Sequence, residues 1–452
     1  MSPKNKYLIG PLVLDCNRGD QALVWEAIRL IRRADPEAEI AIMADDYEDP
    51  QSSQSKQTRA KGIQILPSIL PNPRRSASKN KVEVHDTGIS LLKMKIRALL
   101  DYLQMQVLLL FPRSSFVAKW MLGAERFKTY SYMKGCKALV IKGGGFIYAH
   151  PGIRWFYFIW FGLFSLIIAH KLGIKTIILP NSFGPFENPH GKTLARQVLG
   201  KCDMVAVRER LSFDTLQDML PGKPKQFPDM AFHLPMADKE WARSELEKRK
   251  IPLNQPCVGL TMRPWRFPDA DNPNERYENY IDSHVAFVKY LFEKGYNVVL
   301  FAHVVGPHAH EDDRIALHAL MDRLGDNNSL FYIDGDYDCC QMKAFYGFMD
   351  LMTCTRFHSA IFSLSQKVPC LAISYQGHKT TGIMADLGLE EYVIGINDVN
   401  EDTLVTRFDK LKLHAHTIAE ELKTRIEEIH HALATLDRRY QETVHAAPKV
   451  SA

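Results

Sequence analysis

An arginine and a histidine stand two residues apart in the stretch TCTRFHSAIF, at Arg356 and His358. Arginine presents a planar fork of donors that matches a carboxylate or a phosphate. Histidine titrates near neutral pH, so it can donate a proton. The pair follows an apolar run typical of a buried strand and precedes a predicted helix, whose N-terminus adds positive potential. These residue types and this spacing predict a site for an acidic substrate with a proton donor beside it.

The same turn has a structural interpretation, in which Arg356 satisfies backbone carbonyls and His358 packs in the core. A further polar turn, YQGHKTTG (375–382), follows the next apolar run and supplies Lys379. Because polar groups from two neighbouring strand ends then converge, the functional interpretation is favoured.

The start of the chain offers a second candidate region, in DCNRGDQAL (15–23). Asn17, Gly19 and Asp20 precede a predicted helix, and the amide groups of a first helical turn can bind an anion. Asp20 has an alternative role as the cap of this helix, and cap preferences favour that role.

Two strand ends in the first half of the chain carry small or flexible residues. Gly143, Gly144 and Gly145 follow KALVIK and permit close approach of a ligand to the backbone. GGG is not the GxGxxG fingerprint of dinucleotide-binding proteins. Ser182 lies in the predicted turn NSFGP, where it either binds a ligand or closes the turn.

Three more predicted strand ends carry charged or titratable side chains. Arg208 follows DMVAV, and a charge there either pairs with Glu209 or Asp229 or reaches an anionic ligand. In the second half, Arg263 follows PCVGLTM and His303 follows YNVVLFA, and both are candidate ligand-binding residues.

The elements that must position these residues are short continuous apolar runs, as expected for parallel strands buried on both faces. The predicted strands are 7–14, 39–44, 62–67, 137–142, 175–180, 203–209, 256–263, 296–303, 329–334, 350–355 and 369–375. Helical segments such as 20–33 alternate with them. The pattern predicts a doubly wound α/β architecture, in which ligands bind at the carboxyl ends of the strands.

The strands form two series, which predict two Rossmann-like domains. The first is residues 1–240 with an insertion at about 68–130, and the second is residues 250–400. The join is expected near 236–256, where a charged helix ends in a proline-punctuated loop. Residues 401–452 are expected to form a C-terminal helical tail.

Composition fits a soluble globular protein, with 46% apolar and 24% charged residues. The net charge of +5 is too small to argue for a nucleic-acid partner. The eight cysteines are scattered without a CxxC pair, which predicts buried thiols in a reducing compartment and no metal site. No signal peptide is recognised, so a cytoplasmic location is expected.

Two segments leave a peripheral membrane contact open. Residues 155–169 run fifteen positions without a charge. A spanning helix needs roughly 20 apolar residues, so a buried helix is favoured over a membrane-surface helix. Residues 71–97 hold seven Lys or Arg against two Asp or Glu, and an apolar run to residue 111 follows. Either a solvated insertion before a core helix or docking of 71–111 at an anionic inner leaflet explains this pattern.

Taken in order, the motifs resemble those of the polysaccharide pyruvyl transferases. The resemblance covers about residues 7–390, and Phe357 stands where many members have leucine. It rests on N-x-G-D at 17–20, GGG at 143–145, S-x-G-P at 182–185, V-R-E-R-x-S at 207–212, P-D-x-A-F at 228–232, R-x-H-S-A at 356–360 and Y-x-x-H-K at 375–379.

The resemblance implies a GT-B-like fold, with two Rossmann-like doubly wound domains facing across a cleft. It implies transfer of the pyruvyl group of phosphoenolpyruvate to a sugar, a glycan or a lipid-linked oligosaccharide, which forms a ketal and releases phosphate. Arg356 and His358 match the family's substrate-binding and catalytic pair. Arg208 and Lys379 match as further anion ligands.

In this scheme His358 protonates the methylene carbon of phosphoenolpyruvate, while arginines hold its carboxylate and phosphate. Asp229, His303 and Asp20 are all candidates for the base that deprotonates the sugar hydroxyl. The scheme requires no cofactor and no metal. Two alternatives stay open: a GT-B glycosyltransferase that uses a nucleotide sugar, and a non-catalytic carbohydrate- or membrane-binding component of a polymer assembly system.

Overall fold

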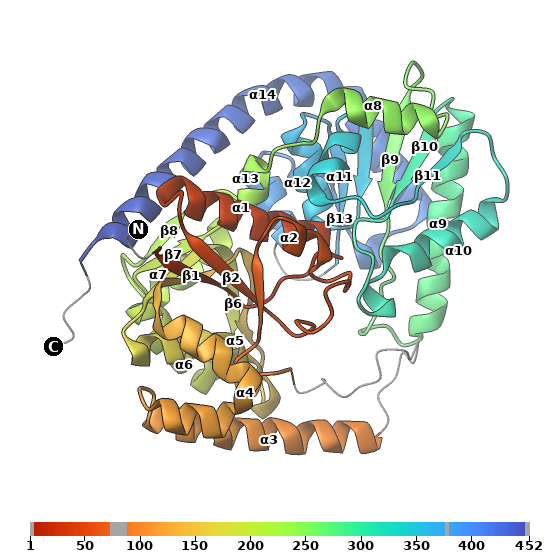
Figure 1. Cartoon of the computed structure of the whole chain (residues 1–452). Coiled ribbons are helices and arrows are strands. Elements are labelled where there is room, and N and C mark those ends of the chain that lie inside the picture. The colour runs from red at the N-terminus through yellow and green to blue at the C-terminus, as the bar shows by residue number, and fades with distance from the viewer. Residues whose placement is uncertain (1–3, 73–87, 376–378, 448–452) are drawn as a thin grey trace. The chain divides into compact units, whose positions relative to one another are not determined.

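The computed structural model describes residues 4–72, 88–375 and 379–447. Contacts divide the chain into two compact units (Figure 1). Unit 1 comprises Met1–Asp15, Leu23–Met230 and Ala432–Ala452, and unit 2 comprises Cys16–Ala22 and Ala231–His431. The main division therefore falls between Met230 and Ala231. The sequence analysis expected the join a few residues later, near 236–256.

Unit 1 alternates strands and helices, as the apolar runs predict. Its strands are β1 (Lys6–Gly10), β2 (Glu39–Ala44), β3 (Gln64–Pro67), β4 (Cys136–Ile141), β5 (Gly144–Ala149), β6 (Lys175–Phe186), β7 (Met204–Val207) and β8 (Pro224–Gln226). Its helices are α1 (Arg18–Ala34), whose first residues belong to unit 2, α2 (Lys56–Ala60), α3 (Gly88–Leu110), α4 (Ser115–Lys134), α5 (Ile153–Leu172), α6 (Pro189–Lys201) and α7 (Arg210–Met219).

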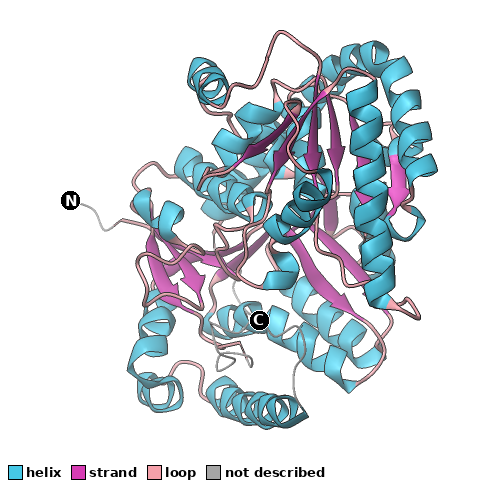
Figure 2. Ribbon diagram, turned by 90° about the vertical axis from the view of Figure 1, so that its right-hand side faces the viewer, coloured by secondary structure: helices cyan, strands magenta, loops and turns pink. Residues whose placement is uncertain are grey.

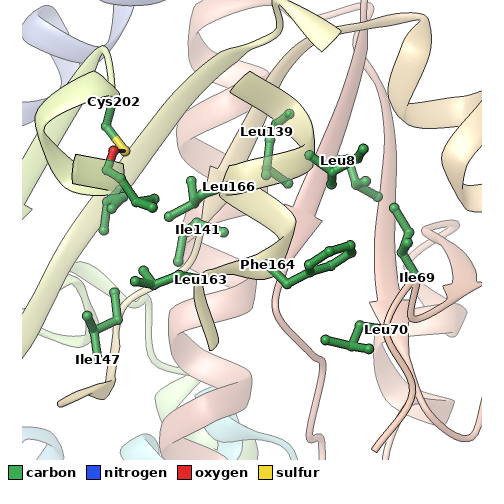
Figure 3. Packing of buried hydrophobic residues seen from close by; sticks show 14 of the residues in the cluster. Leu8, Ile69, Leu70, Leu139, Ile141, Ile147, Leu163, Phe164, Leu166 and Cys202 are labelled. Atoms are coloured by element: carbon green, nitrogen blue, oxygen red, sulfur yellow. Dashed lines mark hydrogen bonds between the residues drawn. The ribbon is translucent and has the colours of Figure 1, made fainter. Parts of the chain in front are cut away.

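The sheet of unit 1 is parallel and runs in the order β3-β2-β1-β4-β6-β7-β8, and β5 also pairs with β6. The strand order reverses between β1 and β4, which is where doubly wound sheets place ligands. Figure 3 shows the core of this unit, with Leu163 and Phe164 of α5 packed near Leu139 and Ile141 of β4.

Unit 2 repeats the alternation. Its strands are β9 (Cys257–Thr261), β10 (Asn297–Phe301), β11 (Leu330–Ile333), β12 (Leu351–Cys354), β13 (Cys370–Ser374) and β14 (Val393–Gly395). Its helices are α8 (Lys239–Lys248), α9 (Pro273–Glu293), α10 (Asp313–Leu324), α11 (Cys339–Tyr346), α12 (Phe357–Ser365) and α13 (Lys379–Asp386), and α14 (Glu401–His445) continues into unit 1. Figure 2 shows the strands of both sheets with helices around them.

The sheet of unit 2 is also parallel and runs β11-β10-β9-β12-β13-β14. Counted within the unit this is the order 3-2-1-4-5-6 of a Rossmann sheet, with its switch point between β9 and β12. The loops after these two strands begin at Met262 and Thr355, so both lie at the position where such sheets bind ligands.

Each predicted strand is present, with ends shifted by a few residues, and three strands were missed. β5, β8 and β14 are short or rich in glycine and polar residues, so they lack an apolar run. The prediction for 181–185 was wrong, because β6 continues to Phe186 and pairs with β5 through Asn181 and Phe183. Ser182 therefore lies within a strand rather than in a turn.

Helix α5 contains the uncharged segment 155–169. Among the described residues it is the helix that is long and apolar enough to cross a membrane, judged by length and composition, and 39% of its most apolar window is buried. Ile159, Trp160, Leu163 and Phe164 are buried in the core of unit 1. One face of the helix therefore packs in the core of unit 1.

Candidate active site

Arg356 lies directly after β12, at the N-cap position of α12. Its Nε and Nη2 donate to Oδ1 of Asp313, at 2.9 and 2.6 Å, and Nη2 also donates to the carbonyl of Glu311. The hydroxyl of Ser359 donates to the Arg356 carbonyl at 2.6 Å, which fixes the turn. These bonds orient the guanidinium through Nε and Nη2.

Asp313 is the buried carboxylate that holds Arg356. Its Oδ2 accepts from the backbone N–H of Val304 at 2.9 Å. Burial raises the pKa of Asp313 to about 6, and the attraction of Arg356 offsets this only in part. A buried ion pair of this kind costs desolvation energy, so the arrangement is better explained by positioning of the guanidinium than by stability.

Arg263 lies just beyond β9 and is also nearly buried. Its guanidinium carbon is 4.2 Å from the ring centre of Tyr375 and 4.9 Å from that of Trp265. Burial lowers the pKa of Arg263, and the neighbouring Arg356 lowers it further. Nε is buried without a hydrogen-bond partner among the described residues. Two neighbouring cations in a low-dielectric surrounding favour the binding of an anion beside them.

His358 lies in the first turn of α12 and meets the start of α1. A Cβ added to Gly19 would lie 2.1 Å from Nδ1 and 2.6 Å from Cβ of His358. That separation is far inside van der Waals contact, so only glycine allows this approach. Gly19 is therefore explained by its contact with the predicted catalytic histidine.

Asn17, rather than Asp20, caps α1. Asn17 Oδ1 accepts from the backbone N–H groups of Gly19, at 3.1 Å, and Asp20, at 3.3 Å. Its Nδ2 donates to Asp20 Oδ2 at 3.0 Å, and the helix begins at Arg18. The prediction that Asp20 is the cap was wrong, because the asparagine preceding the first turn already takes that position.

His303 is buried at the end of β10, and its Nδ1 is 3.0 Å from the hydroxyl of Tyr346. Nε2 has no hydrogen-bond partner among the described residues. Burial lowers the pKa of His303 well below its usual value, and His358, Arg356 and Arg18 act in the same direction. His303 is therefore a neutral imidazole at physiological pH, which is the form a general base requires.

Arg18 is a residue that the sequence analysis missed. It is almost fully buried, Nη2 lies 3.2 Å from Asp336 Oδ1, and its backbone N–H donates to the carbonyl of His303 at 3.2 Å. Arg18 is the variable position of the N-x-G-D motif at 17–20. Its positive charge beside the predicted helix start could have marked it as a candidate. Asp313 was missed for another reason, since its role depends on pairing with an arginine 43 positions away.

A second group of predicted residues forms a buried network in unit 1. Arg208 Nη1 donates to Asp229 Oδ2 and Nε to the Ser182 hydroxyl, both at 2.8 Å. The Ser182 hydroxyl donates to Glu209 at 2.9 Å. Of the alternatives left open, the pairing of Arg208 with Asp229 and Glu209 is present.

The glycine triplet between β4 and β5 has a packing explanation. A Cβ on Gly143 would lie 2.9 Å from the Pro180 carbonyl and 3.0 Å from the Leu23 side chain, and one on Gly144 would lie 3.0 Å from Phe146. The backbone thus approaches the protein's own groups closely.

Gly145 continues into β5, and Lys379 begins α13. The histidine of Y-x-x-H-K, at position 378, lies outside the described residues. No described contact tests the predicted roles of Gly145 and Lys379, so these roles stay predictions.

One cluster has potential metal ligands: Asp338, Cys339 and Cys340 bring ligand atoms within 4.8 Å of one another. Asp338 already caps α11, accepting from the backbone N–H groups of Cys340 and Gln341. Burial raises the pKa of the Cys339 thiol well above its usual value, which disfavours the thiolate that binds metals. These residues are explained as a helix cap.

The two units, each built on a parallel sheet, define a GT-B-like protein, and comparison with solved structures agrees. A putative UDP-N-acetylglucosamine 2-epimerase from Listeria monocytogenes has a TM-score of 0.53 and 12% identity, over 99% of this chain and 93% of that one. UGT73P12 from Glycyrrhiza uralensis has a TM-score of 0.55 and 10% identity, over 98% and 99%. At such identities the likeness shows the fold alone.

The chain matches the polysaccharide pyruvyl transferase family over residues 17–377, and it belongs to that family. The amylovoran biosynthesis protein AmsJ of Erwinia amylovora is 21% identical over 261 residues, which is 56% of this chain and 61% of AmsJ. The chain therefore spans about three fifths of the length of this curated relative.

Proposed function

We propose that the protein transfers the pyruvyl group of phosphoenolpyruvate to a sugar of a polysaccharide or its precursor, forming a ketal and releasing phosphate. The observation that carries this proposal is the pair Arg263 and Arg356, two nearly buried guanidiniums at the switch point of unit 2. Phosphoenolpyruvate carries two anionic groups, a carboxylate and a phosphate, and arginine suits both. Family membership supports a transferase acting in polysaccharide modification.

The proposed reaction adds a sugar hydroxyl across the enol double bond and then displaces phosphate. His358 gives a proton to the methylene carbon, and the first hydroxyl bonds to the neighbouring carbon as its proton passes to a base. The second hydroxyl then bonds to the same carbon while the carbon–oxygen bond to phosphate breaks, and the proton of this hydroxyl leaves with the phosphate. The buried cations stabilise the negative charge of the leaving phosphate.

Three residues were candidates for the base, and their surroundings differ. His303 is neutral and has a buried Nε2 without a described partner. Asp229 is bound to Arg208, and Asp20 accepts from Asn17. We favour His303, because its Nε2 has no described partner and can accept a proton directly, whereas the Asp229 carboxylate is already held by Arg208.

We propose a cytoplasmic enzyme that acts on a glycan or a lipid-linked oligosaccharide and needs no cofactor beyond the co-substrate phosphoenolpyruvate. All eight cysteines are free thiols, which supports a reducing compartment. A lipid-linked acceptor would bring the enzyme to the inner face of the plasma membrane.

The test is phosphate release from phosphoenolpyruvate by the purified protein, with and without polymeric or lipid-linked glycans. Glycan-dependent release would support the proposal if His358→Ala abolishes it and His416→Ala, at an exposed position of α14, retains it. In parallel, binding of phosphoenolpyruvate and of nucleotide sugars is measured by calorimetry. Binding of a nucleotide sugar without binding of phosphoenolpyruvate would favour the glycosyltransferase alternative.

A further inference from the structure

Helix α3 of unit 1 has two apolar faces. One face is in the core, where Met105 and Leu108 are buried and the Tyr102 ring meets Trp160 of α5 edge-on, with ring centres 4.7 Å apart. The other face is exposed, and its residues are Leu92, Ile96, Leu99, Leu103, Val107 and Leu110. At about 100° per residue, these six lie within an arc of about 80°, opposite the buried residues. An amphipathic helix of a soluble protein would carry polar residues on that arc.

Helix α4, which packs beside α3 (Figure 1), extends the apolar character. Phe116 and Trp120 are four positions apart and so share one face, and they are 82% and 71% exposed. We define these two residues with the six of α3 as the α3–α4 apolar face. Exposed patches rich in leucine and aromatic residues mark contact sites rather than ordinary surface.

The charges around this face are positive. Lys93 and Lys95 are exposed and flank the leucine stripe on its two sides, each at roughly 80° from its centre. Lys119 flanks Phe116 and Trp120 on α4 in the same way. Residues 88–134 hold eight Lys or Arg against two Asp or Glu, and one of those two, Asp101, is buried.

We propose that the α3–α4 apolar face docks on an anionic phospholipid bilayer. Leucine side chains and an exposed tryptophan enter the acyl boundary, and lysines that flank them reach the headgroups, as in interfacial helices. A second copy of the chain is a poorer occupant, because a twofold contact would place this positive surface against itself. The inference stands apart from the proposed reaction, since it concerns lipid alone.

The docking surface corresponds in part to the segment 71–111 that the sequence analysis singled out. Residues 73–87 of that segment lie outside the described residues. The described helices narrow the candidate surface to side chains that can be substituted without disturbing the core, because all eight are exposed or at the surface.

The test is flotation of the full-length protein with vesicles of phosphatidylcholine alone or mixed with phosphatidylglycerol, free of glycans. Wild-type protein is expected to bind the anionic vesicles and to release at high salt. Leu99→Gln with Leu103→Gln is expected to weaken binding by roughly tenfold or more, because each buried leucine contributes to partition. The control is Leu413→Gln, which replaces a more exposed leucine on α14, and this variant should bind as the wild type does.

A second arm tests the charges. Lys93→Gln, Lys95→Gln and Lys119→Gln together should reduce binding to anionic vesicles by roughly tenfold or more and leave binding to neutral vesicles unchanged. Sedimentation velocity on the same proteins reports self-association. Absence of vesicle binding overturns the proposal. If dimerisation is then seen and is lost in the leucine variant, the face is a contact between copies.

Discussion

Gly19 and His358 are in such close contact that a Cβ at position 19 would lie 2.1 Å from the imidazole Nδ1. The two residues are 339 positions apart in the chain, and each belongs to a motif that looked separate in the sequence. The contact explains why the first turn of α1, next to the capping Asn17, contains a glycine. It also makes the position of the imidazole depend on the backbone at residue 19.

Gly19→Ala should therefore displace His358. If the histidine is the proton donor, phosphate release should fall by about 100-fold or more, because small displacements of reacting groups are costly. Overpacking should also cost about 1 to 3 kcal/mol of stability. The assay is turnover with phosphoenolpyruvate, alongside thermal unfolding.

Gly200→Ala is the matched control for this substitution. An added Cβ at Gly200 in α6 meets Leu220 at an ordinary 3.4 Å, so activity should be unchanged and stability equal or slightly higher. Full activity in Gly19→Ala would contradict the assigned role of His358.

Arg263→Met should weaken substrate binding without unfolding the protein. Burial and Arg356 already disfavour the charge of Arg263, so a methionine of similar length between Trp265 and Tyr375 should change stability by less than about 1.5 kcal/mol. The KM for phosphoenolpyruvate should rise by roughly tenfold to a thousandfold, as expected for a lost charge-assisted contact.

Steady-state kinetics measure this change, with Arg266→Met as control because Arg266 is exposed three residues further along. An unchanged KM together with a large loss of stability would show that Arg263 is structural.

Sequence reasoning found the strand ends because buried parallel strands are continuous apolar runs, such as NVVLF in β10 and LMTC in β12. Arg356 and His358 could be predicted because a charge directly after a buried strand costs desolvation energy unless it binds a partner or a ligand. Sequence reasoning missed β5, whose residues GGFIYA begin with two glycines. It could not assign the partner of Arg356, since no local pattern connects that residue to Asp313.

Asp313 should give the protein a specific dependence of stability on pH. Its folded pKa of about 6 lies above the ordinary 3.8, chiefly because the carboxyl is buried. The folded state therefore binds the proton more tightly, so this contribution is full below about pH 4 and is lost as pH rises through 6. A shift of about two units corresponds to roughly 3 kcal/mol.

Urea unfolding of the wild type at pH 4.5 and 6.5 measures this contribution, by comparison with Asp313→Asn. The asparagine variant should lack that part of the pH dependence. Asp322→Asn, exposed on the same helix α10, should retain it. If the free energy of unfolding changes equally between pH 4.5 and 6.5 in all three proteins, Asp313 keeps an ordinary pKa.

Substitution of Asp229 tests whether this residue is structural or catalytic. It is fully buried and accepts from Arg208 at 2.8 Å. Asp229→Asn removes one of the two buried counter-charges of Arg208 and leaves Glu209, so the free energy of unfolding should fall by about 1 to 3 kcal/mol. Asp214→Asn removes the partner of exposed Arg210 and should cost less than about 1 kcal/mol.

Arg208→Met with Asp229→Leu and Glu209→Gln should recover part of the stability lost by Asp229→Asn, because the three paired charges then leave the interior together. Chemical denaturation of Asp229→Asn and of the triple variant measures the stability recovered, and turnover is measured on the same samples. If Asp229→Asn keeps its stability and loses turnover, Asp229 is the base and His303 is not. A large loss of stability with turnover retained at low temperature assigns Asp229 to the buried ion pair of unit 1.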